Sequence, residues 1–253
     1  MPYIDRDGVA IWFEARGDGP PLLLSHGYSA TGVMWEGQVE ALRDRYRVIT
    51  WDMRGHGRSD YPEDPDAYSE AATVGDMAAI LDECEAPAAA IGGLSLGGYM
   101  SLAFHFAHPE RTRCLLLFDT GPGYKSDEGR AEWNRTSLAR ADDLESRGFD
   151  ALSSSREVRS RNHRSPLGLS RAARGMLAQK DDRIIQSLPG IGVPTLVVVG
   201  ADDTPFLGAS AYMAKKIEGA RQVVLPDAGH ASNLDQPEAF NAAMVEFLSS
   251  LPT

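Results

Sequence analysis

The chain has 253 residues, of which 43% are hydrophobic and 24% are charged, and its formal net charge is -11 at pH 7. This length and composition predict one globular domain over residues 1–253 rather than a disordered or fibrous chain. The strong negative charge argues against nucleic acid or an anionic membrane surface as the main partner.

No export signal or membrane span is expected. The N-terminus lacks a basic stretch followed by an apolar core, and no apolar run is long enough to cross a bilayer. The two cysteines, Cys84 and Cys114, have no CxxC spacing, which favours a reducing compartment over a disulfide framework. We therefore expect a cytoplasmic protein that is a monomer or a small homo-oligomer.

Short apolar runs alternate with helical patterns along most of the chain. Strands are predicted at residues 9–13, 22–25, 46–51, 88–91, 114–118, 194–200 and 222–225. Helices are predicted at residues 34–42, 72–84, 96–107, 209–217 and 238–248. This alternation predicts an α/β fold, in which a mostly parallel sheet is covered by helices on both faces.

Residues 124–188 interrupt the alternation with polar helical segments rich in arginine. Between Gly121 and Ile185 there are 11 Arg and 2 Lys against 10 acidic residues, so the segment is basic while the rest of the chain is acidic. We expect this segment to be a helical lid over the active site. Its basic character favours a substrate that carries a carboxylate.

Residues 88–100 predict a strand, a tight turn and a helix, with Ser95 at the turn. A serine in such a turn has a strained backbone and an exposed hydroxyl. Gly93 and Gly97 stand two residues to either side, where strand and helix cross too closely for a larger side chain. The pattern predicts that Ser95 is a catalytic nucleophile.

A serine hydroxyl needs a base to take its proton and an acid to orient that base. His230 follows the last predicted strand, and Asp202 and Asp203 follow the strand before it. The carboxyl ends of strands in an open α/β sheet meet at one crevice, so these side chains can converge on Ser95. From strand positions alone, either aspartate could orient His230, or could cap the segment that follows.

The oxyanion of a tetrahedral intermediate needs two N–H donors. We expect one to be the backbone N–H of Leu96, at the start of the helix after Ser95. The other candidate is the N–H of Tyr28, in the loop after the strand at residues 22–25.

Together these motifs resemble the α/β-hydrolase superfamily over nearly the whole chain. The resemblance rests on residues 26–28, 52–59, 93–98, 200–203 and 229–230. It implies the α/β-hydrolase fold with a small helical lid, a Ser95–His230–Asp203 triad, and hydrolysis through an acyl-enzyme without a cofactor or a metal. In this family the acid usually lies three residues after the glycine that ends its strand, which favours Asp203 over Asp202.

Within the superfamily, residues 229–240 and 93–98 are similar to 3-oxoadipate enol-lactonases and related small carboxylesterases. Leu94 and Ala231 stand where the carbon–carbon bond hydrolases of aromatic degradation usually have Asn and Trp. Ser95 stands where haloalkane dehalogenases and epoxide hydrolases have Asp. We therefore expect hydrolysis of a small-molecule carboxylic ester or lactone, with an anionic substrate favoured by the basic lid.

Three alternatives stay open: carbon–carbon bond cleavage on the same triad, cofactor-free perhydrolysis, and a hydrolase-like ligand receptor with very slow turnover. The substrate pocket is expected to include Tyr124, Trp133, Met176 and Phe206. The first three of these could equally form the core of the lid.

Overall fold

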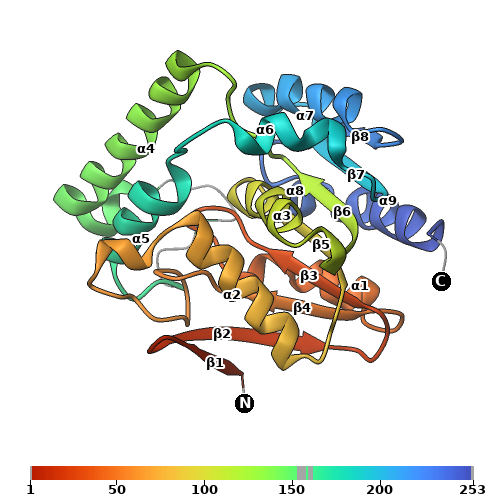
Figure 1. Ribbon diagram of the computed structural model, residues 1–253, viewed down its shortest axis with the longest axis horizontal. Coiled ribbons are helices and arrows are strands. Elements are labelled where there is room, and N and C mark those ends of the chain that lie inside the picture. The colour runs from red at the N-terminus through yellow and green to blue at the C-terminus, as the bar shows by residue number, and fades with distance from the viewer. Residues whose placement is uncertain (1, 153–157, 159–161, 252–253) are drawn as a thin grey trace.

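One eight-stranded sheet runs through the computed structural model, which describes residues 2–152, 158 and 162–251 (Figure 1). The strand order is β1-β2-β4-β3-β5-β6-β7-β8. β1 and β2 pair with their neighbours in antiparallel fashion, and every pair from β4 to β8 is parallel. The strands are β1 (Tyr3–Arg6), β2 (Val9–Arg16), β3 (Pro21–Ser25), β4 (Arg47–Trp51), β5 (Ala89–Leu94), β6 (Thr112–Phe118), β7 (Thr195–Gly200) and β8 (Arg221–Leu225).

Helices cover both faces of this sheet, and two hydrophobic clusters form the core between them. Side chains of α2, α3 and α7 belong to one cluster, and those of α1 and α9 to the other. The predicted α/β fold is thereby confirmed. No helix in the described part of the chain has the length and apolar character needed to cross a bilayer. The helices are α1 (Glu36–Leu42), α2 (Glu70–Glu83), α3 (Leu96–Ala107), α4 (Asp127–Arg147), α5 (Pro166–Ala172), α6 (Arg183–Ser187), α7 (Thr204–Lys216), α8 (Ser232–Asp235) and α9 (Pro237–Ser249).

The strand order reverses its direction between β3 and β5, which lie side by side in the sheet. From β3 the chain continues to β4 on one side, and from β5 it continues to β6, β7 and β8 on the other. In open α/β sheets the crevice at such a reversal, beyond the carboxyl ends of the strands, is where ligands bind. The loops after β3 and β5 carry Tyr28 and Ser95, so topology alone brings these two residues together.

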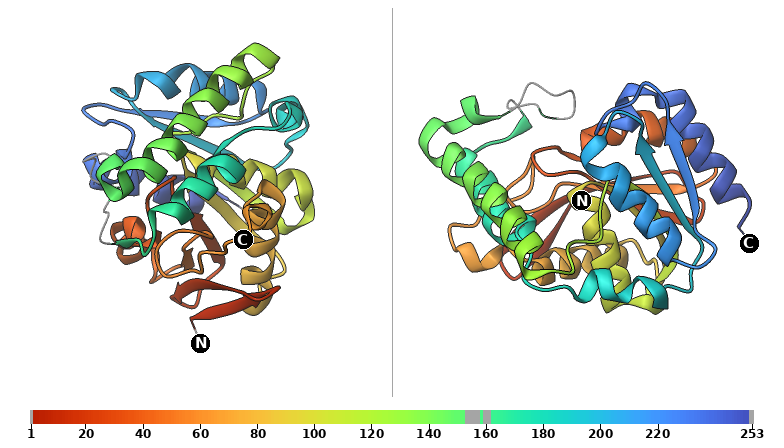
Figure 2. Two further views of the ribbon diagram at one scale, coloured as in Figure 1. Left: turned by 90° about the vertical axis from the view of Figure 1, so that its left-hand side faces the viewer. Right: turned by 90° about the horizontal axis from the view of Figure 1, so that it is seen from above.

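Between β6 and β7, the described residues of the segment 124–188 form α4, α5, α6 and short helical turns, with no strand. We call this segment the helical insert. α4 begins where the Ser126 side chain accepts a hydrogen bond from the N–H of Gly129 (3.1 Å). α4 and α5 lie at the left in Figure 1, and α4 crosses in front of the sheet in the left view of Figure 2.

The first half of α4 is bonded to residues 177–179, near the other end of the helical insert. Trp133 Nε1 donates to the carbonyl of Leu177 (2.8 Å). The Asn134 carboxamide makes two bonds with the backbone of Gln179: its Nδ2 donates to the carbonyl, and its Oδ1 accepts from the N–H (both 2.8 Å). Further along α4, Ser137 Oγ donates to the carbonyl of Ala173 (2.6 Å). The buried residues of α4 are Ser137, Ala141 and Leu144, and the polar sequence of the helix follows from the exposure of most of its other residues.

Several elements differ from the sequence-based expectation: α8 was not predicted, and β2 extends to Arg16 instead of ending at residue 13. β1 was not predicted, although Asp7 and Gly8 both have positive φ (57° and 81°) and form the two-residue turn that joins β1 to β2. α7 begins at Thr204 rather than at residue 209. Its first turn contains Pro205, which is favoured there because the proline ring fixes a helical φ and no N–H is needed.

Candidate active site

Ser95 lies in the sharp turn between β5 and α3. Its φ of 54° and ψ of −116° are unfavourable for a residue with a side chain. Two bonds from the end of β6 hold this backbone: the Ser95 N–H donates to Phe118 O (2.9 Å), and Thr120 Oγ1 donates to Ser95 O (2.6 Å). A Cβ on Gly97 would lie 2.2 Å from the carbonyl oxygen of Ser25, so only glycine allows α3 to approach β3 this closely.

His230 and Asp203 are joined by a hydrogen bond. His230 Nδ1 lies 2.9 Å from Asp203 Oδ2, and the Phe206 ring stacks on the imidazole with 4.9 Å between ring centroids. Asp203 is buried, with 4% of its surface exposed, whereas Asp202 is exposed. Of the two candidate acids, the structure therefore brings Asp203 to the histidine ring. Ser95, Asp203 and His230 all line one cavity.

Asp119 is a buried carboxylate that the sequence analysis did not select. It bonds both the loop that carries Asp203 and the loop that carries His230. Asp119, directly after β6, accepts a hydrogen bond from the Gly200 N–H (2.8 Å) and another from Ser232 Oγ. Burial raises the pKa of Asp119 to about 7. Asp119 thereby connects the strand end before Asp203 to the residue two positions after His230.

One predicted oxyanion donor stands at the start of α3 and the other in the loop after β3. Leu96 is the first residue of α3, a position where the N–H has no helical carbonyl one turn earlier to bond. Tyr28 lines the same cavity as Ser95 and His230, and its phenol donates to the carbonyl of Leu169 in α5 (2.8 Å). The helical insert thus contacts the loop that carries Tyr28.

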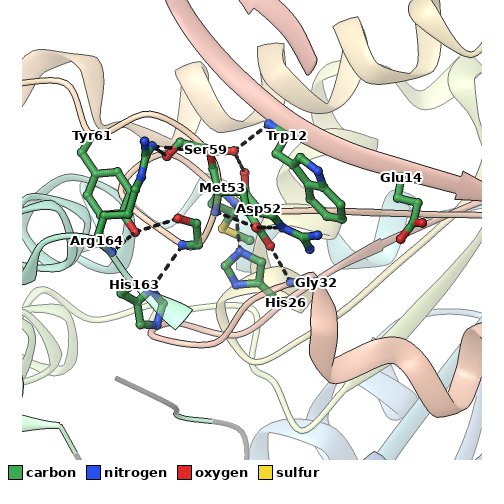
Figure 3. A network of polar contacts seen from close by, with 12 residues as sticks. Trp12, Glu14, His26, Gly32, Asp52, Met53, Ser59, Tyr61, His163 and Arg164 are labelled. Atoms are coloured by element: carbon green, nitrogen blue, oxygen red, sulfur yellow. Dashed lines mark hydrogen bonds and ion pairs between the residues drawn. The ribbon is translucent and has the colours of Figure 1, made fainter. Parts of the chain in front are cut away.

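The residue after Tyr28 is held by two histidines. The Ser29 N–H donates to His56 Nε2 (3.2 Å), and His163 Nε2 lies 2.9 Å from the Ser29 carbonyl oxygen. His163 belongs to the helical insert, and its Nδ1 accepts from the Gly57 N–H (3.2 Å). Figure 3 shows His163 beside the polar network of the loop after β4. The positive φ of Ser29 (58°) indicates a backbone that needs such support.

Three imidazoles in this region are uncharged in the geometry observed. Each of His26, His56 and His163 has one ring nitrogen facing a carbonyl oxygen and the other accepting a backbone N–H. A nitrogen that accepts cannot carry a proton, so each ring holds one proton only. Burial lowers the pKa of all three, that of His26 to about 4.

Two cavities meet at Ser95. The narrow cavity has a volume of about 230 Å³ and the wide cavity about 540 Å³. They share walls made by Ser95, Trp133, Leu177, Pro205 and Phe206. Leu96 lines the narrow cavity and Tyr28 lines the wide one.

Three of the four predicted pocket residues line these cavities. Tyr124 lines the narrow cavity, and Trp133 and Phe206 line both. Met176 is the exception: it is 2% exposed, belongs to the hydrophobic core and lines neither cavity. Residues 173–177 form a π-helical turn that directs the next residue, Leu177, to the cavities instead.

The helical insert also supplies two residues that no sequence pattern selects: Gln179 in the narrow cavity and Arg140 in the wide one. Their approach to Ser95 depends on tertiary packing, which no local pattern reports. Across residues 2–152, 158 and 162–251, no group of three or more His, Cys, Asp or Glu side chains is arranged to hold a metal ion.

Comparison with known proteins gives consistent results. A model of the alpha/beta hydrolase family matches residues 22–243. The chain is 29% identical to a protein of Bacillus subtilis (strain 168) named putative 2-succinyl-6-hydroxy-2,4-cyclohexadiene-1-carboxylate synthase, over 97% of each chain. It is 31% identical to 3-oxoadipate enol-lactonase 2 of Acinetobacter baylyi, over 90% of this chain and 88% of that one.

Among solved structures, a thermophilic esterase from Thermogutta terrifontis superposes with a TM-score of 0.86 at 30% identity, over 100% of this chain and 98% of that one. The expected resemblance to enol-lactonases and esterases is confirmed by these relatives. With the family model covering most of its length, the chain belongs to the alpha/beta hydrolase family.

Proposed function

We propose that this protein is a serine hydrolase that cleaves a carboxylic ester or a lactone of a small molecule. The observation that carries the proposal is the 2.9 Å contact between His230 Nδ1 and Asp203 Oδ2, at a cavity that Ser95 also lines. Relatives named as enol-lactonase and esterase support the same chemistry.

The first half of the reaction forms an acyl-enzyme. Asp203 accepts a hydrogen bond from the His230 Nδ1–H, which leaves the unprotonated Nε2 free to take the hydroxyl proton of Ser95 as its oxygen attacks the carbonyl. The N–H groups of Leu96 and Tyr28 donate to the oxyanion of the tetrahedral intermediate. His230 then gives its proton to the leaving alcohol oxygen.

The second half is hydrolysis of the acyl-enzyme. His230 takes a proton from water, the hydroxide attacks the acyl carbonyl, and Ser95 leaves with that proton. Because the two cavities meet at Ser95, one receives the acyl group and the other the alcohol group of the substrate.

A panel of p-nitrophenyl esters and lactones, measured on the purified full chain, tests the proposal. Ser95→Ala is expected to lower turnover by about four orders of magnitude, because no other group supplies the nucleophile. Asp203→Asn is expected to lower kcat by about a thousandfold or more, since it stabilises the wrong tautomer of His230. Asp202→Asn is the matched control and should keep wild-type kinetics. Undiminished ester hydrolysis by Ser95→Ala would contradict the proposal.

The same panel separates the alternatives. Turnover of a vinylogous 1,5-diketone without turnover of esters would indicate carbon–carbon cleavage. Peracid formation from a carboxylic acid and peroxide would indicate perhydrolysis. A burst of one p-nitrophenol per chain without steady turnover would indicate a receptor that retains the triad.

We further propose that the substrate carries a carboxylate, which Arg140 binds in the wide cavity. Among the described residues, no ion pair includes Arg140, whereas Asp143 in the same wall is 4.0 Å from Arg147. An anion in the wide cavity would give Arg140 an ion-pair partner, which none of the described residues supplies.

Mono-p-nitrophenyl adipate and its neutral methyl ester test this charge preference. Arg140→Gln is expected to raise KM for the acid about fivefold, a loss on the order of 1 kcal/mol for an exposed charge, and to leave the neutral ester unchanged. Arg135→Gln, on the same helix but outside both cavities, is the control and should change neither value. Equal KM changes for the two esters would rule out a carboxylate site at Arg140.

A further inference from the structure

The narrow cavity is mainly aromatic and aliphatic, and none of its lining residues, all of them in the described part of the chain, is charged. Tyr124, Trp133, Leu177 and Phe206 are among the residues of its apolar wall. A carboxylate would lose its hydration here without gaining a cation, which is costly. The part of a substrate that enters this cavity is therefore uncharged.

Most polar side chains in this wall already have partners. Thr120 Oγ1 donates to the Ser95 carbonyl (2.6 Å), and Trp133 Nε1 donates to the Leu177 carbonyl (2.8 Å). The Tyr99 phenol donates to Glu70 Oε2 (2.9 Å). These groups are engaged inside the protein and are not available to a ligand.

Gln179 is different, because its carboxamide has no partner among the described residues. Its Oε1 is buried without a donor, packed against Gly123, where an added Cβ would lie only 2.9 Å away. Its Nε2 is not buried in this way and makes no hydrogen bond within the described chain. The Nε2 group is therefore the end of this carboxamide that is open to a ligand, and a bound acceptor can replace water there.

The position of Gln179 does not depend on its side chain. The two bonds with Asn134 use only the backbone N–H and carbonyl of Gln179. They hold the residue at the wall while its carboxamide remains unengaged. Gly123, with φ of +90°, leaves the space in which this carboxamide lies.

We infer that the narrow cavity binds the uncharged end of the substrate and that this end carries an oxygen substituent, a ketone, ether or hydroxyl group, which accepts a hydrogen bond from Gln179 Nε2. The inference rests on the proposed ester or lactone hydrolysis and adds to it the class of group beside the scissile bond. Gln179 is a specificity-determining residue that takes no part in the chemical step.

Two pairs of esters of matched shape test this inference, one for each side of the scissile bond. p-Nitrophenyl 4-oxopentanoate and pentanoate differ by an oxygen in the acyl group. 2-Methoxyethyl and butyl butanoate differ by an oxygen in the alcohol group. The ratio of kcat/KM for the oxygenated ester to that for the alkyl ester cancels the intrinsic reactivity of each ester when variants are compared.

Gln179→Met is expected to lower this ratio about tenfold in the pair whose variable group enters the narrow cavity. The variant removes no hydrogen bond within the described protein, so its melting temperature should equal or exceed that of wild type. Gln179→Leu is a second variant with the same expected outcome. Gln222→Met makes the same change on an exposed position of β8 and should leave both ratios unaltered.

The outcomes are distinct. Unchanged ratios in both pairs, with hydrolysis still abolished by Ser95→Ala, would overturn the inference and leave the proposed function standing. Absence of any hydrolysis that depends on Ser95 would overturn the proposed function itself. A tenfold fall in one pair for both Gln179 variants, but not for Gln222→Met, would establish the subsite.

Discussion

The carboxyl edge of the sheet and the helical insert that faces it build the site by different means. At the edge, backbone approaches backbone, as where Gly97 lies against the Ser25 carbonyl and the Ser95 N–H bonds Phe118 O. In the insert, side chains bond distant carbonyls, as Trp133 does with Leu177. Close backbone contact restricts residue type severely, whereas a side-chain contact can be made by many residues.

A single added carbon atom at the carboxyl edge of the sheet should therefore destabilise the fold strongly. In Gly97→Ala the new Cβ would lie 2.2 Å from Ser25 O and 2.7 Å from His26 O. We expect a loss of about 4 kcal/mol or more in the free energy of unfolding, because both contacts are with backbone. Denaturant unfolding measures this loss.

Gly208→Ala is the control for that substitution. Gly208 lies within α7, and a Cβ there meets nothing within 4 Å. Alanine at an open helical position should stabilise the protein by up to about 1 kcal/mol. Equal melting temperatures for Gly97→Ala and Gly208→Ala would show that the edge is not limited by backbone contact.

Asp119 gives the carboxyl edge of the sheet a pH dependence of its own. Its pKa is about 7 in the folded protein, above its ordinary value of 3.8. Because the folded protein binds the Asp119 proton more tightly than the unfolded chain does, the protonated group stabilises the fold. This stabilisation is complete below about pH 4 and is lost as the pH rises through 7. As the pH rises from 5 to 7, ionisation of Asp119 should lower the free energy of unfolding by about 2 to 3 kcal/mol.

Asp119→Asn is expected to abolish this slope, since the amide keeps an acceptor for the Gly200 N–H and does not titrate. Denaturant unfolding at several pH values, with Asp202→Asn as the exposed control, measures the difference from wild type. Parallel stability profiles for wild type and Asp119→Asn would show that Asp119 does not titrate in this range.

The smallest expected effect lies where the two regions meet. His163 of the insert bonds Ser29 O, one residue from the proposed oxyanion donor Tyr28. His163→Ala should lower kcat about tenfold through misplacement of this loop, with a smaller change in KM. His163→Gln, which keeps a donor for Ser29 O, should recover part of the loss. An unchanged kcat in His163→Ala would show that this contact of the insert does not position the Tyr28 loop for the reaction.

The same contrast explains what the sequence could and could not reveal. Ser95, with glycines two residues to either side, and His230 can be predicted from the sequence because strand ends and backbone crowding leave a local signature. Asp119 has a similar signature, because it is a carboxylate directly after a strand. It was not selected, because a catalytic triad needs one acid and Asp203 was assigned that role. The bracing role of Asp119 depends on Ser232, far away in the chain.

In the insert the local signal was weaker. Met176 and Leu177 are both apolar, and only the π-helical turn decides which of them faces the cavities. His163 and Gln179 act through contacts that bring together residues far apart in sequence. Hydrophobic periodicity predicts which face of a helix is buried, but not which cavity that face borders.

The bonds between the first half of α4 and residues 177–179 have a consequence for protein engineering. β6 and β7 are adjacent parallel strands, so a crossover must always connect them, and α6 packs against α3 on that path. Residues 133 to 179 are closed upon themselves by the bonds of Trp133 and Asn134. This segment could therefore be exchanged as one unit between family members. If both of its ends are transferred together, the bonds that join them are transferred too, and the connection from β6 to β7 through α6 is unchanged.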